Sequence, residues 1–443
     1  MFWAAVSGLI LLAFAYVVGM AAWQSAKYPL YGFQDLLMPY TIDVVIVGWL
    51  AWIGSSIGSF LNVVAWRMPR GKSVGGRSHC PRCGTQLLAR DNFPVLGWLA
   101  VRGRCRACRL PISIRYPIVE ASVGMTLTLL GIAELYRFSL PGDVATHVHG
   151  PIRSPMIGPT LLSILIYHVV AVSVAWAIGL ILYDRQRVPA KLIGFAAVAI
   201  ALVPLAWPHL LVVTWMQLPA VVSPSPADVG VGPTWRDGAT TIDAIIRVIT
   251  ALAAAGLAGR SLARGFCPTA DLKLNPLGSG SKRLIDLIVM ISVPAIVVGW
   301  QALSAVLLIA SLAAVAVGGL FNRTDALGRF GLMMPVALTV QLVSWRPADQ
   351  IRFWPSETSD PWTILVAAAA VLCIPMWLSE RPAPVDQETP QPSDVDDGSD
   401  DHELPDKEAP PDSPEPSETE PRGVTDDDNE IGIVAPDADL TGR

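Results

Sequence analysis

Four cysteines in one polar stretch of the chain have the spacing of a metal site. Two CxxC pairs, separated by 21 residues, are formed by Cys80, Cys83, Cys105 and Cys108. Two residues between cysteines let one turn direct both thiolates at the same ion, and a second pair completes a tetrahedral zinc site. Gly84, directly after the first pair, supplies the backbone freedom for a tight turn. Because cysteine occupies all four ligand positions, the pattern predicts a structural zinc ion rather than a catalytic one.

Two other states of these cysteines compete with zinc binding. A pair of disulfides is disfavoured in the cytoplasm, where thiols are kept reduced, and four free thiols would make the spacing a coincidence. Four neighbouring arginines would offset the negative charge of a zinc–thiolate centre and favour the thiolate forms. They are Arg82, Arg104, Arg106 and Arg109. The two isolated cysteines, Cys267 and Cys373, are predicted to be small apolar residues in or near helices.

The elements that must position this site are predicted to be membrane helices. Of the 443 residues, 52% are hydrophobic and only 16% are charged, whereas a soluble protein carries about 25% charged residues. The apolar residues gather in runs of about 20, long enough to cross a hydrocarbon core of about 30 Å. Such runs must be helical, because lipid offers no hydrogen bonds to the backbone. The fold class is therefore predicted to be an all-α polytopic membrane protein.

About ten transmembrane spans are predicted. They lie at 2–23, 42–66, 118–136, 161–183, 191–213, 242–259, 284–300, 302–320, 330–345 and 362–378. The first is interpreted as a retained helix rather than a signal peptide, because it lacks a basic start and a small-residue cleavage site.

The distribution of Lys and Arg orients these spans. The segment 67–116 holds eleven basic residues and one acidic residue, which predicts a cytoplasmic position. Alternation then places the other basic loops in the cytoplasm and the long loops 137–160 and 217–241, which carry few charges, outside. Both termini are predicted to be cytoplasmic.

Composition divides the chain into four parts: N-terminal transmembrane helices at 1–66, the cysteine module at 67–117, a transmembrane bundle at 118–379 and a tail at 380–443. The tail holds 21 acidic and four basic residues and is rich in Pro and Ser. It has too little apolar surface to offset the entropy of ordering, so it is predicted to be disordered. Two interpretations stay open for it: a solvated extension, or a docking segment for a basic partner.

Two stretches of the sequence resemble a known family. GSFLNVVAWRMPRGKS (58–73), followed by CPRC and then by NFPVLGWLAVRGRCRACRLPISIRYPIVE (92–120), is similar to the N-terminal region of bacterial prepilin leader peptidases. These are membrane aspartic peptidases of type IV pilus and type II secretion systems. The resemblance implies a multi-pass protein of the bacterial inner (plasma) membrane that cleaves the leader peptides of prepilins or pseudopilins at the cytoplasmic face. The predicted partners are these leader segments and the lipid bilayer, and no nucleic-acid partner is predicted.

The resemblance also implies two catalytic aspartates. The first corresponds to Asp184 in ILYDRQRVPAKL, which without the resemblance would be interpreted as an interfacial aspartate paired with Arg185 or Arg187. The second ends a GxGD motif that here reads LGSGSKRLID, with Ser281 at the aspartate position. An aspartic peptidase uses one carboxylate as a general base and one carboxylic acid as a proton donor, and losing such a group costs about 10²–10⁴-fold in rate. Serine can fill neither role unaided.

Another carboxylate could compensate for Ser281. Asp286 follows it by five residues, about 140° around a helix and about 7.5 Å along it. Asp286 is interpreted either as a substitute or as a polar residue satisfied within the bundle. Asp271 and Asp243 are further candidates.

The resemblance thus predicts an aspartic endopeptidase, with its catalytic competence left open. The alternative is a non-catalytic relative that binds prepilin-like segments or assists assembly of the pilus or secretion machinery. Family members often also methylate the new N-terminus with S-adenosylmethionine. No nucleotide-type loop in this sequence supports or excludes that activity.

Overall fold

The computed structural model describes residues 2–80, 82–141, 155, 157–213, 215, 240–318, 325–356 and 359–378. Within these ranges every regular element is a helix, and only two isolated β-bridges occur, which confirms the all-α prediction. The acidic tail at 380–443 and most of the two loops predicted to be external lie outside the described residues.

Seven of the described helices are long and apolar enough to cross a membrane. They are α1 (Phe2–Lys27), α2 (Phe33–Arg67), α4 (Arg115–Leu135), α5 (Pro159–Tyr183), α8 (Thr241–Phe266), α9 (Ser279–Ala316) and α10 (Ala326–Asp349). Two shorter apolar stretches, Ala190–Ala206 and Pro361–Met376, are also helical. The first consists of α6 (Ala190–Ala196), the π-helix η3 (Ala197–Leu202) and α7 (Val203–Ala206), and the second lies within α11 (Pro361–Leu372) and α12 (Ile374–Leu378). Each predicted span therefore falls on a helical segment.

Two of the predicted spans, 284–300 and 302–320, belong to the single element α9. A straight helix of 38 residues would be about 57 Å long. Yet Asp325, nine residues beyond the end of α9, pairs with Arg283 in its second turn, and nine residues span at most about 32 Å. The two halves of α9 therefore fold back on each other, and the break lies at Gly299.

Gly299 makes this reversal feasible. Its φ of +84° is open to glycine but strained for residues with a side chain. A Cβ atom there would also lie 3.1 Å from Nη2 of Arg247. Arg247, which is buried in α8, donates from Nη2 to the carbonyl of Val297 at 3.3 Å. It thereby satisfies a carbonyl at the end of the first half of α9, where regular helical bonding ends.

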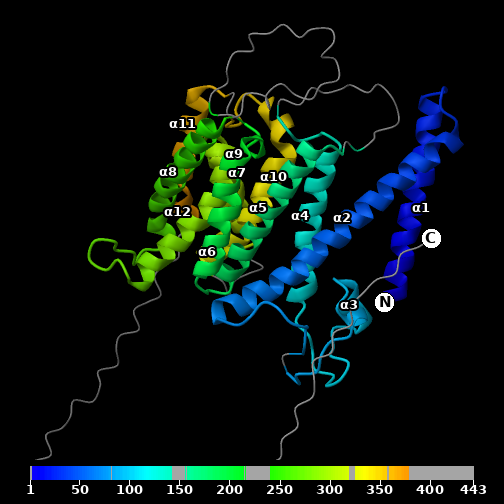
Figure 1. Ribbon diagram of the computed structural model, residues 1–443, viewed down its shortest axis with the longest axis horizontal. Coiled ribbons are helices and arrows are strands. Elements are labelled where there is room, and N and C mark those ends of the chain that lie inside the picture. The colour runs from blue at the N-terminus through cyan, green and yellow to red at the C-terminus, as the bar shows by residue number, and fades with distance from the viewer. Residues whose placement is uncertain are drawn as a thin grey trace, which may run out of the picture. The chain divides into compact units, whose positions relative to one another are not determined.

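The helix ends that carry the polar residues meet at one end of the bundle. Ion pairs join the start of α4 to the loop after α5, the loop before α6 to α9, and α9 to the start of α10. The cysteine-rich segment 67–116, which contains α3 (Leu96–Ala100), connects α2 to α4 at this same end (Figure 1). We call this end the module end.

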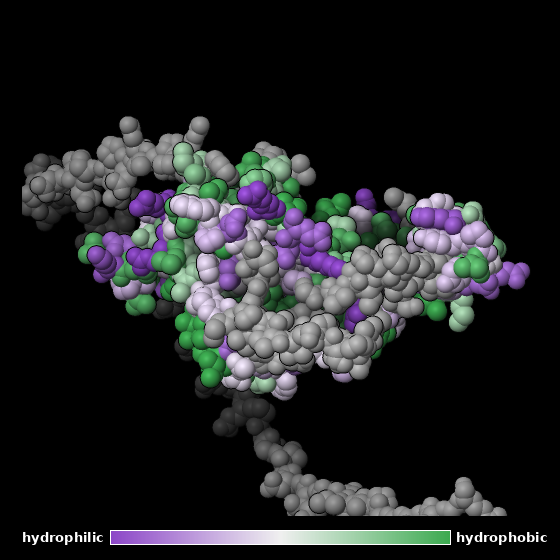
Figure 2. Space-filling model, turned by 90° about the horizontal axis from the view of Figure 1, so that it is seen from above, coloured by the Kyte–Doolittle hydropathy of each residue, from purple (hydrophilic) through white to green (hydrophobic). Residues whose placement is uncertain are grey.

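The opposite end of the bundle is seen in Figure 2, where hydrophilic and hydrophobic side chains are interspersed. On α1 the apolar side chains of Leu9, Leu11 and Phe14 are largely exposed. Such exposure is costly in water but is expected for helices surrounded by lipid.

Candidate functional site: the module end of the bundle

The four predicted cysteine ligands converge on one point. Their sulfur atoms all lie within 4.8 Å of one another, with 3.9 Å between Cys80 and Cys108 and 4.0 Å between Cys83 and Cys105. Four sulfurs placed about 2.3 Å from a tetrahedral zinc ion are about 3.8 Å apart. All four cysteines are free thiols, so no disulfide competes for them. The cluster suits a tetrahedral metal ion.

Two similar turns build this cluster. In the first, the amide of Gly84 donates to the carbonyl of Cys80, and in the second the amide of Arg109 donates to that of Cys105, both at 2.9 Å. Gly84 and Arg109 occupy the equivalent place in each turn, with φ of +71° and +61°. Gly84 was predicted from its residue type. Arg109 was not, because a left-handed arginine leaves no signal in the sequence.

Local hydrogen bonds favour thiolate forms at two of the ligands. A hydrogen bond with the Thr85 side chain, 3.4 Å away, lowers the pKa of Cys83 to about 6. Backbone amides of Cys108 and Ala107 lower the pKa of Cys105. Thiolate is the form that binds metal, so the protein prepares these ligands without needing an ion to do so.

Among the described residues of the module, one of the four nearby arginines forms an ion pair. Arg106 donates from Nε and Nη2 to both oxygens of Asp91, at 2.9 and 2.6 Å. This hydrogen bonding lowers the pKa of Asp91. Asp91 ends the short helix η2 (Ala89–Asp91) just before α3, so the pair joins the α3 segment to the second turn.

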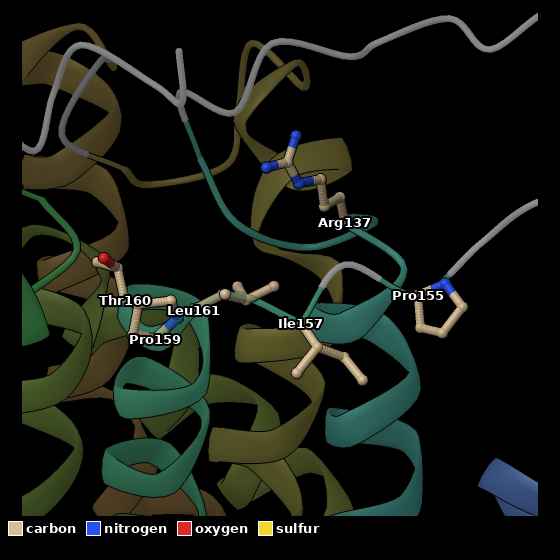
Figure 3. Close-up of a pocket in the computed structure, with 7 residues that line it drawn as sticks. Arg137, Pro155, Ile157, Pro159, Thr160 and Leu161 are labelled. Atoms are coloured by element: carbon tan, nitrogen blue, oxygen red, sulfur yellow. The ribbon is translucent and has the colours of Figure 1, made fainter. Parts of the chain in front are cut away.

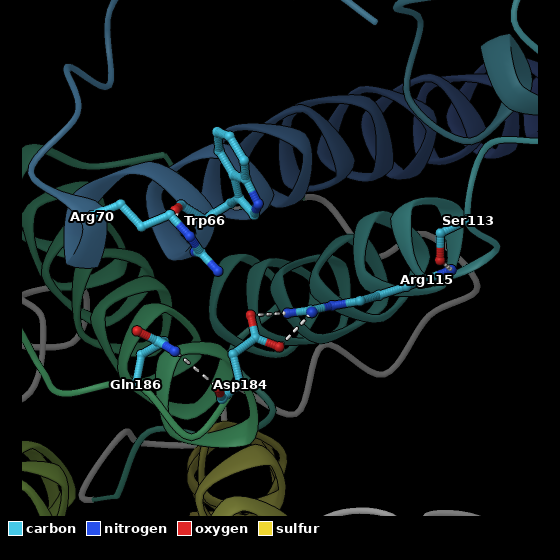
Figure 4. Close-up of polar contacts among 6 residues, drawn as sticks. All are labelled: Trp66, Arg70, Ser113, Arg115, Asp184 and Gln186. Carbon is cyan, nitrogen blue, oxygen red and sulfur yellow. Dashed lines mark hydrogen bonds and ion pairs between the residues drawn. The ribbon is translucent and has the colours of Figure 1, made fainter. Parts of the chain in front are cut away.

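Asp184 lies directly after α5 and is held by an arginine that the sequence analysis missed. Arg115, the first residue of α4, donates from Nη1 and Nη2 to the two carboxylate oxygens at 2.5 and 2.8 Å. Figure 4 shows the guanidinium facing the carboxylate edge on. The Arg115 side chain also lies 5.4 Å from the Tyr183 ring. Because Arg115 follows Cys108 by seven residues, the cysteine module and Asp184 are directly linked.

Ser281 is buried in the first turn of α9, and its hydroxyl is used locally. It donates to the carbonyl of Asn275 at 2.7 Å. The serine thereby fastens the loop that precedes α9 to the helix. This hydroxyl supplies no carboxyl group that could exchange a proton in partnership with Asp184.

Asp286 is the carboxylate that reaches the loop after Asp184. Its side chain is 1% exposed and accepts from Nε and Nη2 of Arg187 at 2.5 and 3.2 Å. Arg187 lies three residues beyond Asp184. The fold therefore brings Asp286 and Asp184 to the same short segment, although each carboxylate binds its own arginine.

The remaining carboxylates have other roles. Asp271 accepts two backbone amides of its own loop, from Lys273 and Leu274, both at 2.9 Å. Asp243 lies in the first turn of α8, about 35 Å from the other end of that helix, where Phe266 stacks on Phe330 at the module end. Asp243 is therefore not brought to Asp184.

The sequence analysis also missed a third ion pair at the module end. Arg283 pairs with Asp325, which accepts the amide of Gly328 at 2.9 Å as the N-cap of α10. An Asp before an apolar helical run is an N-cap signal, so Asp325 could have been found. Arg283 and Arg115 could not, because their partners lie 42 and 69 residues away along the chain.

Two cavities among the described residues lie at the other end of the bundle. One of about 280 Å³ is lined by residues that include Arg137, Pro159 and Leu161 (Figure 3). The second, of about 550 Å³, also begins at Pro159 and Thr160. These residues start α5, about 36 Å along the helix from Asp184, so neither cavity serves the carboxylates.

The fold and this site define a helical membrane-type protein with a four-cysteine cluster at one end of its bundle. Residues 52–133 match the family described as "Bacterial Peptidase A24 N-terminal domain". Through this segment the chain is related to the prepilin leader peptidases, which confirms the resemblance inferred from residues 58–120. The matched segment contains the four cysteines and Arg115 but ends before Asp184.

Three relatives illustrate the extent of the similarity. A "Prepilin leader peptidase/N-methyltransferase" of Myxococcus xanthus (strain DK1622) is 53% identical over 87 residues, 19% of this chain and 25% of the relative. A "Type 4 prepilin-like proteins leader peptide-processing enzyme" of Escherichia coli O78:H11 is 42% identical over 98 residues, 18% and 36% of the two chains. A "Prepilin leader peptidase/N-methyltransferase" of Burkholderia pseudomallei (strain 1026b) is 36% identical over 126 residues, 23% and 39%.

The chain thus spans between a quarter and two-fifths of the length of these relatives. No solved structure matches the chain.

Proposed function

We propose that the protein processes the N-terminal leader peptides of prepilins or pseudopilins at the module end of its bundle, which faces the cytoplasm of a bacterium. The observation that carries this proposal is the contact between Arg115 and Asp184. It joins the segment shared with prepilin leader peptidases to the aspartate that the resemblance names as catalytic. The relatives' names support the substrate class.

In this proposal the cysteine cluster holds one structural zinc ion. When bound, the ion crosslinks the two cysteine turns and needs no open coordination position. The chain's own part is to hold the module rigid, so that Arg115 emerges from it at the right place to meet Asp184. The module therefore acts on the carboxylate through position rather than through metal chemistry.

Cleavage would require changes at the carboxylates. Both oxygens of Asp184 accept from Arg115, so Asp184 has to leave this arginine before it can take a proton from water as a general base. Asp286 is the proposed proton donor, because Arg187 ties it to the loop that carries Asp184. Arg187 would then have to release Asp286 as well.

One observation favours the second function, binding of leader segments without cleavage. Ser281 stands where the family has its second aspartate, and its hydroxyl is bonded to Asn275. A chain without an effective dyad would retain the module and the helix ends as a recognition surface. Methylation of the new N-terminus with S-adenosylmethionine is proposed only together with cleavage.

The decisive experiment is co-expression with a prepilin from the same bacterium, followed by mass measurement of the prepilin N-terminus. Loss of the leader supports processing, and an additional methyl group supports methyl transfer. An intact leader in a prepilin that still co-purifies with the protein supports the binding function instead. Asp184→Asn is the matched inactive control.

We further propose a bacterial inner-membrane protein with ten crossings, both termini in the cytoplasm and a disordered acidic tail. The two halves of α9 count as two crossings in this topology. Reporter fusions after Arg82, Arg185 and Arg283 should report a cytoplasmic position, and fusions near Gly150 and Gly230 should report export. A cytoplasmic signal at Gly150 would refute the alternation.

A further inference from the structure

Five polar side chains inside the bundle are fully buried, and each has a polar atom without a hydrogen-bond partner in the described part of the chain. They are Glu134, Ser139, His168, Gln341 and Trp345. Buried polar groups are nearly always satisfied, by protein or by ordered water. Five exceptions among so few helices call for a physical explanation.

The helix packing brings these residues to one level. Glu134 Oε1 and His168 Nδ1 are 2.6 Å apart, which joins α4 to α5. Gly179 of α5 packs on the backbone of Gly331 in the antiparallel helix α10. His168 precedes Gly179 by eleven residues, or about 16 Å along α5. The same distance beyond Gly331 along the antiparallel α10 reaches residue 342, so the packing sets His168 beside that position.

Gln341 and Trp345 flank this level on α10. Ser139 is brought to them directly, since the amide of Arg346 donates to the Ser139 carbonyl at 2.9 Å. The five residues therefore lie at about the same level of α4, α5 and α10. This region of the packing is about 13 Å inside the start of α5, in the half of the bundle that is remote from Asp184.

The unpartnered atoms identify the ligand by their chemistry. Trp345 Nε1 and Gln341 Nε2 can only donate, whereas Glu134 Oε2 in a carboxylate can only accept. The Ser139 hydroxyl does both. Two N–H donors would oppose a metal cation, which needs oxygen or nitrogen lone pairs from every neighbour. Water both donates and accepts, and a buried water usually has two to four polar partners.

We propose that this region is an internal water-binding site, in which bound water links the Glu134–His168 pair to Ser139, Gln341 and Trp345. The water would join α4, α5 and α10 at this level. It also keeps an ionisable pair satisfied inside the membrane bundle, where an unsatisfied one is costly. The site is independent of leader processing.

Ser139→Ala in the full-length protein tests this proposal. The Ser139 hydroxyl has no protein partner within the described residues, so its removal affects only bound water. If water is there, the melting temperature of the purified protein should fall by about 2–4 °C. If the hydroxyl is dry, removing a buried unsatisfied group should raise the melting temperature, and this result would overturn the proposal.

Ser311→Ala is the matched control. Ser311 is also fully buried, but its hydroxyl donates to the carbonyl of Leu308 at 2.9 Å within its own helix. A drop for Ser139→Ala no larger than that for Ser311→Ala would count against the site.

A double-mutant cycle keeps the test decisive if the single shifts are small. In this proposal the Glu134 and Ser139 side chains interact only through the bound water. The effects of Glu134→Gln and Ser139→Ala on the melting temperature should therefore be non-additive. Strict additivity would overturn the shared water. A density map that resolves water should show it between Glu134 Oε2, His168 Nε2 and Gln341 Nε2, and a dry region there would also overturn the proposal.

Discussion

The cysteine module and the aspartates at the module end lie side by side but are assembled in opposite ways. Each cysteine pair is made by residues three positions apart, and one tight turn suffices to align them. Asp184 and Asp286 meet arginines that are 69 and 99 residues distant in the chain. The module is thus a product of local spacing, whereas the state of each carboxylate is a product of helix packing.

The segment shared with relatives contains the cysteine module but neither Asp184 nor Asp286. The family match covers the module and stops at residue 133. The Arg106–Asp91 pair lies inside the match, whereas each of the three ion pairs between helix ends includes a residue beyond it. The cysteines match the expected pattern completely, while the GxGD motif ends in Ser281. The cysteine module can thus be shared with relatives while the rest of the chain differs from them.

The largest expected effect concerns the module. Replacing Cys80 and Cys105 together by serine should abolish zinc binding and make the segment 67–116 sensitive to protease, because structural zinc sites in small peptides contribute about 10–16 kcal/mol of binding free energy. Elemental analysis and limited proteolysis measure this. Cys373→Ser, at a cysteine outside the cluster, should leave the zinc in place. Zinc-free wild-type protein, purified without chelator, would contradict the assignment.

The second effect concerns the missing carboxylate. Ser281→Asp should raise prepilin cleavage by about 10²–10⁴-fold over wild type, because it places a carboxyl group at the family's position, whereas Asp286 is a poor substitute as long as Arg187 holds it. The gain should disappear when Asp184→Asn is added. Efficient cleavage by wild type that depends on Asp286 and not on Asp184 would show that the dyad lies elsewhere.

The third effect compares two of the ion pairs. Arg187→Gln should destabilise the protein by about 3 kcal/mol, because it leaves the buried Asp286 carboxylate without its partner. Arg115→Gln should cost only about 1 kcal/mol, since both Arg115 and Asp184 are partly exposed to solvent. Thermal unfolding in detergent measures both. Adding Asp286→Asn should recover most of the Arg187→Gln loss, and no recovery would mean that Arg187 acts through other contacts.

The smallest effect is a pH dependence inside the module. The Arg106 guanidinium lowers the pKa of Asp91, so the pair stabilises the module above the unfolded-state pKa of an aspartate, about 3.9. That contribution is lost as the pH falls through the lower folded-state value. Arg106→Gln should speed proteolysis of the module by about twofold to fivefold at pH 7. The difference between wild type and variant should shrink as the pH falls below about 3.9, and a difference that does not shrink would exclude Asp91 as its source.

Much of the fold follows from the sequence because membrane insertion is decided by local composition. A run of about 20 apolar residues must become a helix wherever it lies, so each predicted span falls on a helical segment. The break between 284–300 and 302–320 was predicted from composition, but the reversal at Gly299 depends on Arg247, which comes from another helix.

Local spacing determined one part of the candidate site, and helix packing determined the other. Cysteine spacing alone determined the cluster at Cys80, Cys83, Cys105 and Cys108, because ligands on one turn need no distant partner. Only the tertiary structure decided that Asp184 is held by Arg115, Asp286 by Arg187, and Ser281 by its own loop. An ion pair between remote residues leaves no periodicity or spacing in the sequence, since its partners become neighbours only when the helices pack.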